Sequence, residues 1–71
     1  MAWNLKMTTK LGTVYWDTLT PDDSPTPLQD EGRATHGWDW MEYTTQAEAE
    51  ARGQHLVETQ HFETYEAVEA E

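Results

Sequence analysis

The chain has 71 residues, no cysteine, and a formal charge of −10 that results from fourteen acidic and four basic residues. A chain of this length can form one small domain, expected here to span residues 1–71, and without cysteine it forms neither disulfides nor thiolate metal sites. The negative charge argues against direct binding of nucleic acid or of an anionic membrane, because both require cationic side chains.

Neither a membrane span nor a signal peptide is indicated by the sequence. No stretch approaches the ~20 consecutive apolar residues of a transmembrane helix. The N-terminal segment MAWNLKMTTK has polar residues at alternate positions and lacks the apolar core of a signal peptide. We therefore expect a cytoplasmic protein.

Two strands are predicted at the start of the chain. Residues 3–11 alternate between apolar and polar side chains, which is typical of a half-buried strand. Gly12 interrupts the pattern, and residues 13–19 (TVYWDTL) are rich in β-branched and aromatic side chains. The two segments are expected to pair as a hairpin or to follow a bulge at Gly12.

Residues 20–35 (TPDDSPTPLQDEGRAT) carry all three prolines and four acidic residues. Proline removes backbone donors, and Asp and Ser compete for local hydrogen bonds, so the composition predicts a long loop.

A third strand and a helix are predicted next. Residues 37–43 alternate again, so that Trp38 and Trp40 are expected to face the core. Thr45 and Glu48 have the spacing of a capping box, which predicts a helix over residues 45–59. Glycine at position 53 costs ~1 kcal/mol in a helix relative to alanine, and we expect it to allow close approach of the helix to the tryptophan face.

The tail, residues 61–69, is compatible with a fourth strand, in which Phe62 and Val68 face inward, or with a continuation of the helix; aromatic and β-branched residues favour the strand. The sequence thus predicts an α+β fold, with an antiparallel sheet of three to four strands and one helix packed across one face. The residues expected to be buried are Leu5, Met7, Trp38, Trp40, Ala49, Gly53, Leu56 and Phe62.

No catalytic, metal-binding or cofactor-binding pattern is found in the sequence. His36, His55 and His61 lack the spacing of metal ligands on a helix. Ser24 has no recognisable base nearby, and no carboxylate pair is marked by apolar neighbours that would shift its pKa. We therefore expect neither an enzyme nor a cofactor.

Acidic residues are concentrated in the second half of the chain, where residues 36–71 hold nine acids and one base. Duplex DNA carries one negative charge per ~1.7 Å, and proteins bind that field with Lys and Arg. A rigid protein with closely spaced carboxylates could occupy the basic groove in which such a protein binds DNA. The alternative is that the charge only maintains solubility. The carboxylates expected to bind a partner are Asp39, Glu42, Glu63, Glu66 and Glu69.

The segment WMEYTTQAEAEARGQHLV, residues 40–57, resembles a pattern found in small uncharacterised proteins of bacteriophages that infect actinobacteria. The matching positions are Tyr43, Thr44, Thr45, Ala47, Glu48, Ala49, Leu56 and Val57. Gly53 and His55 depart from the pattern, in which Gly and His are adjacent, because Gln54 separates them here. In size and acidity the chain is also similar to phage-encoded inhibitors of host defence, such as anti-CRISPR and anti-restriction proteins.

These observations lead to two hypotheses. The first is a phage-encoded inhibitor that binds a basic nucleic-acid-binding surface of a host protein by charge mimicry, without contacting nucleic acid or membrane itself. The second is a structural or assembly module, for example a homodimer, in which the acidity serves solubility only.

Overall fold

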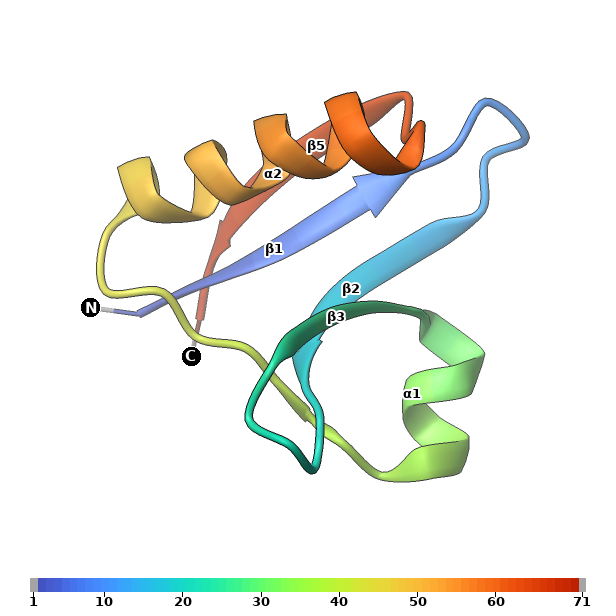
Figure 1. Ribbon diagram of the computed structural model, residues 1–71, viewed down its shortest axis with the longest axis vertical. Helices are drawn as coiled ribbons and strands as arrows, with labels where there is room; N and C mark the ends of the chain where they lie inside the picture. The colour runs from blue at the N-terminus through green and yellow to red at the C-terminus, as the bar shows by residue number, and fades with distance from the viewer. Residues whose placement is uncertain (1, 71) are drawn as a thin grey trace.

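The computed structural model describes residues 2–70 and has five strands and two helices (Figure 1). In chain order these are β1 (Trp3–Thr8), β2 (Val14–Leu19), β3 (Pro25–Gln29), α1 (Asp30–His36), β4 (Asp39–Trp40), α2 (Gln46–Gln60) and β5 (Thr64–Glu69). The predicted α+β class and antiparallel sheet are confirmed, and the sheet has one strand more than the upper prediction.

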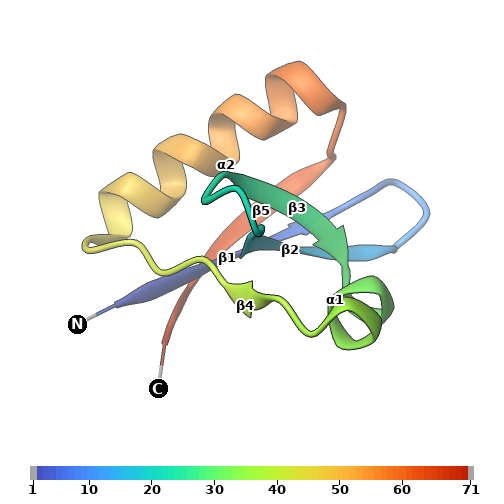
Figure 2. The same ribbon diagram turned by 60° about the horizontal axis from the view of Figure 1, so that its bottom comes forward.

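The sheet has the strand order β3-β2-β1-β5, and every pairing in it is antiparallel. β1 pairs with β5 along its whole length but with β2 only over Lys6–Thr8. Beyond this point the short strand β4 takes over the pairing with β2, with Trp40 opposite Thr18 (Figure 2). The segment that leads from β4 to α2 therefore fills the end of the sheet where β1 and β2 diverge.

Helix α2 lies across β1 and β5 (Figure 1). Its start is fixed by the predicted capping box: the Thr45 side chain accepts a hydrogen bond from the Glu48 backbone nitrogen at 3.2 Å. Ala49, Gly53 and Leu56 form its buried stripe, as predicted.

The hydrophobic core lies between α2 and this face of the sheet. It consists of Leu5, Met7, Leu56 and Phe62, with Tyr15, Tyr43, Val57 and Tyr65 packed around them. These four buried residues were all predicted from the sequence. The prediction that the first strand extends to residue 11 is wrong, since a turn follows Thr8 and Leu11 is 93% exposed.

The prediction that Trp38 and Trp40 form the core beneath the helix is wrong, because both are only half-buried. Trp40 pairs with Thr18, and alternate residues of β2 share a face, so Trp40 lies on the face opposite α2 together with Trp16. The third strand was expected over residues 37–43, but the observed strand consists of Asp39 and Trp40 alone.

The predicted loop at residues 20–35 is replaced by strand β3 and helix α1. Prolines 25 and 27 are compatible with a strand because β3 is at the edge of the sheet. Alternate residues direct their backbone nitrogens to the same side, so both ring nitrogens can point away from β2.

The tail forms a strand, as the preferred alternative predicted, but its two faces are reversed. Tyr65 pairs with Met7 and lies on the α2 side, whereas Val68 pairs with Asn4 on the opposite side. Phe62 is buried in the connection before β5 begins, and its burial therefore does not indicate which residues of the strand face inward.

Candidate functional site

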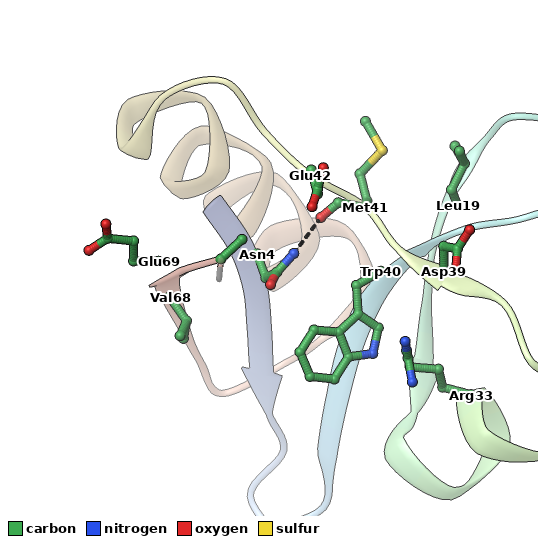
Figure 3. A pocket seen from close by; sticks show the side chains of 10 residues that line it. Asn4, Leu19, Arg33, Asp39, Trp40, Met41, Glu42, Val68 and Glu69 are labelled. Atoms are coloured by element: carbon green, nitrogen blue, oxygen red, sulfur yellow. Dashed lines mark hydrogen bonds between the residues drawn. The ribbon is translucent and has the colours of Figure 1, made fainter. Parts of the chain in front are cut away.

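The face of the sheet opposite α2, which we call the open face, carries a groove of about 940 Å³ (Figure 3). Five segments contribute to it: the start of β1, the end of β2, α1, residues 39–42, and residues 68–70. The lining residues are Asn4, Leu19, Arg33, Asp39, Trp40, Met41, Glu42, Val68, Glu69 and Ala70.

The inner part of the groove is formed by Asn4 and Val68, which are register partners on β1 and β5 and therefore point to the same face. Asn4 is 7% exposed, and its carboxamide nitrogen donates a hydrogen bond to the Met41 carbonyl oxygen at 3.1 Å. This bond fixes the orientation of the amide. The carboxamide oxygen accepts no hydrogen bond from residues 2–70 and is not enclosed by the protein.

Trp40 forms the opposite wall of the groove and is part of a stack of three side chains. Its ring is parallel to that of Trp16, with 4.2 Å between centroids and 7° between planes, and the Arg33 guanidinium carbon lies 4.5 Å from its centroid. Trp40 Nε1 and Arg33 Nε are enclosed without an acceptor in residues 2–70. The stack is thus held by contacts between flat surfaces and by cation–π attraction.

Three of the five carboxylates expected to bind a partner are brought to this groove. Asp39, Glu42 and Glu69 line it and are all exposed, although the Glu69 carboxylate points outward from the rim (Figure 3). The lining includes one cation, Arg33, among the residues that the structure describes. Carboxylates therefore outnumber cations around the groove.

The other two expected carboxylates lie apart from the groove. Glu66 is exposed on the open face, where it forms an ion pair of 3.9 Å with Lys6. Glu63 precedes β5, and its backbone nitrogen bonds to the Thr8 carbonyl oxygen, at the far end of the strand from Glu69. The expectation that all five share one connected surface is wrong. Residues three apart on a strand point to opposite faces, so Glu66 points to the open face, whereas Glu69, the register partner of Trp3, points toward the α2 side and reaches the groove only at its rim.

A buried polar network lies behind the groove, on the α2 side of the sheet. The Asp17 side chain is fully buried; the Tyr43 hydroxyl donates to its Oδ2, and Arg52 Nε lies 3.5 Å from the same oxygen. Arg52 also donates to the Pro25 carbonyl oxygen at 3.1 Å. One carboxylate thereby connects β2, α2 and the segment between β4 and α2.

The network changes the acidity of both titratable partners. Burial raises the pKa of Asp17 above its ordinary value, and the contacts with Tyr43 and Arg52 offset part of this rise. Burial and the adjacent Asp17 carboxylate likewise raise the pKa of the Tyr43 hydroxyl. Asp17 is thus a carboxylate with a perturbed pKa, which the sequence did not identify although it stands beside aromatic residues.

The network also positions the wall of the groove. The Met41 backbone nitrogen donates to the Asp17 carbonyl oxygen at 2.9 Å, and Tyr43 exchanges two backbone hydrogen bonds of 2.8 Å with Trp3. Residues 41 and 42, which line the groove, are therefore fixed on both sides. Asn4 and Arg33 were not predicted as site residues, since an alternating strand and a polar loop give no signal that either contributes to a groove.

The described chain shows no sign of a metal centre or of a membrane helix. Among residues 2–70, no three His, Asp or Glu side chains cluster in a way that could hold a metal ion. Neither helix in this part of the chain is long and apolar enough to cross a membrane.

Comparisons with protein-family models, with curated proteins and with solved structures gave no match to this chain.

Proposed function

We propose that the protein is a small acidic interaction protein that binds a basic, nucleic-acid-binding surface of another protein through the open face of its sheet. The observation that carries this proposal is the groove, in which exposed carboxylates surround a concave surface containing a tryptophan. In this proposal the protein acts by occupying its partner and catalyses no reaction.

The physical argument concerns the partner's charge. A protein that binds nucleic acid has Lys and Arg side chains already positioned for phosphates, so a carboxylate-rich surface can engage the same side chains. The chain carries a formal charge of −10, which also accelerates encounter with a cationic surface. We further propose that the protein is phage-encoded, acts in the host cytoplasm, and inhibits its target by excluding nucleic acid.

The test begins with capture of partners from a bacterial host lysate by the wild-type protein and by the variant Asp39→Asn/Glu42→Gln/Glu69→Gln. The partner that the wild type retains should be lost as salt rises, because exposed charges are screened over ~8 Å at physiological ionic strength. Duplex DNA should compete for that partner. Binding that is insensitive to salt, or equal in the variant, contradicts the proposal.

A second candidate function, an assembly module, is supported by the apolar side chains on the surface. Trp16, Trp38 and Trp40 are half-buried, and Leu19 on the groove is 37% exposed. Self-association through the open face would cover Trp16 and Trp40. Sedimentation that detects dimers with increasing concentration would favour this function, and a single monomeric species throughout would exclude it.

A further inference from the structure

We propose that the groove on the open face is a socket for an arginine side chain of the partner protein. This inference rests on the proposed function, and it specifies which residue of a basic partner anchors the complex. Three features of the groove support it: an orientated acceptor at its inner end, carboxylates around its rim, and apolar surface on two sides.

The orientated acceptor is the carboxamide oxygen of Asn4. Because the amide nitrogen is bonded to the Met41 carbonyl oxygen, the oxygen is the atom left to receive a donor from the groove. Asn4 is also 93% enclosed by its surroundings, since it is 7% exposed, so the position of this acceptor is set before a ligand arrives. A ligand that binds here must therefore supply N–H or O–H groups.

The charge of the groove identifies the donor as a cation. Asp39 and Glu42 belong to the segment that carries Trp40, although the Asp39 side chain is directed away from the Trp40 ring, and Glu69 stands at the opposite rim of the groove. A guanidinium has five N–H donors in one plane, so it can bond to Asn4 and to a carboxylate together, whereas an ammonium offers a single compact centre.

The walls of the groove match the stem of an arginine. Val68 and Trp40 present apolar surface on two sides of the groove, and Met41 contributes its backbone carbonyl, which binds Asn4. A single ring face cannot hold both Trp16 and Arg33 at these distances, so they cover opposite faces of Trp40 and leave its edge toward the groove. The ring edge can pack against methylene groups by van der Waals contact, and its partial positive charge disfavours a guanidinium beside it, which directs the guanidinium onward to the acceptors.

The experiment titrates the protein with a short peptide in which glycine and arginine alternate. Two matched peptides replace arginine by lysine or by citrulline, which has the same shape without the charge. NMR spectra of the ¹⁵N-labelled protein report on the Asn4 side-chain amide and on the Trp40 indole, the latter assigned with Trp40→Phe. The arginine peptide should shift both signals and bind at least about five-fold more tightly than the lysine peptide.

A pair of variants tests the location. Val68→Phe fills the groove without changing the charge, whereas Val14→Phe makes the same change on the same face of the sheet, outside the groove. Val68→Phe should weaken binding of the arginine peptide about ten-fold or more, which corresponds to 1.4 kcal/mol, and Val14→Phe should leave it within about two-fold. Both variants should retain the amide spectrum of the fold.

The outcomes separate this inference from the proposed function. Equal binding of the arginine peptide by both variants, or equal binding of the lysine peptide by the wild type, overturns the arginine socket. If the captured partner is nevertheless lost in high salt and by the carboxylate variant, the proposed function stands without the socket. If Val68→Phe fails to fold, the location is tested by the NMR signals of Asn4 and Trp40 in the wild-type protein. If the arginine peptide shifts neither signal, the socket is overturned.

Discussion

Gly53 of α2 lies directly against the ring of Tyr65 on β5. A Cβ atom at Gly53 would be 2.6 Å from the Tyr65 Cγ and Cδ2 atoms and 2.8 Å from its Cβ. The buried glycine therefore sets the separation between helix and strand, as expected from the sequence, although its neighbour is a tyrosine of β5 and not the tryptophans.

Replacing Gly53 by leucine should destabilise the fold by about 1–3 kcal/mol or more, because the side chain would force α2 away from β5. Even Gly53→Ala should destabilise, since the clash with Tyr65 outweighs the gain of ~1 kcal/mol in helix propensity. Chemical denaturation measures both effects. Ala51→Leu, at an exposed position of the same helix, is the control and should change stability little; an equally stable Gly53→Leu protein would show that the two elements can separate freely.

The buried Asp17 should make stability depend on pH. Its pKa is raised above the ordinary 3.8 in the folded state, so the protonated form is favoured by folding. The resulting stabilisation is complete below about pH 4 and is lost as pH rises through the raised pKa. As pH rises from about 4 through the raised pKa of Asp17, the unfolding free energy of Asp17→Asn should therefore fall less than that of the wild type. Glu50→Gln, which neutralises an exposed carboxylate, should retain the wild-type slope.

The Tyr43 hydroxyl should contribute to the stability of the fold in two ways. Tyr43→Phe removes its hydrogen bond to the buried Asp17, which should cost about 1–3 kcal/mol near neutral pH. The pKa of Tyr43 is also raised from 10.0 in the folded state, so the wild type should lose stability as pH rises above about 10, and the variant should lose less. Tyr15→Phe, which keeps the ring contact with Phe62, serves as the comparison; equal effects of both changes would contradict this role.

Helix α2 could be predicted from the sequence because its signals are local. Thr45 and Glu48 are three residues apart and determine the start of the helix, and the stripe of Ala49, Gly53 and Leu56 follows the helical period. The alternation at residues 3–8 located β1 for the same reason. Such patterns depend only on residues that are close together in the sequence.

Features that depend on sheet order could not be predicted in this way. Pro25 and Pro27 indicate a loop unless one knows that β3 is an edge strand. Trp38 and Trp40 indicate a core unless one knows that β4 pairs with the end of β2 and exposes its tryptophan to the open face. The groove could not be predicted for the same reason. Asn4, Trp40 and Val68 meet only because β1 diverges from β2 and pairs with β5.

Arg33 should determine whether α1 stays on the sheet. The helix Asp30–His36 has no buried residue and no side-chain cap at its start, and Arg33 contacts the Trp40 ring. Arg33→Ala should accelerate amide hydrogen exchange throughout α1 while exchange in α2 is unchanged, because so short a helix is unstable without tertiary contacts. Arg33→Lys, which keeps the cation, should have a smaller effect. Unchanged exchange in Arg33→Ala would mean that the connection to β3 is sufficient to hold α1 on the sheet.

The acidic residues should differ in their effect on partner binding according to where they lie. Neutralising Asp39, Glu42 and Glu69 removes three carboxylates that line one groove, whereas neutralising Asp23, Asp30 and Glu31 removes the same charge from an exposed segment elsewhere. A cationic surface gains most from charges that it can engage together, so the groove variant should weaken binding of the captured partner more and should reduce its salt dependence more. The variant Glu63→Gln/Glu66→Gln/Glu69→Gln should fall between them, because β5 places Glu63 far from the groove and pairs Glu66 with Lys6. Binding constants measured at several salt concentrations give this order directly. Equal losses in all three variants would mean that the partner responds to net charge alone, and the opposite order would move the binding surface to the segment that contains Asp23.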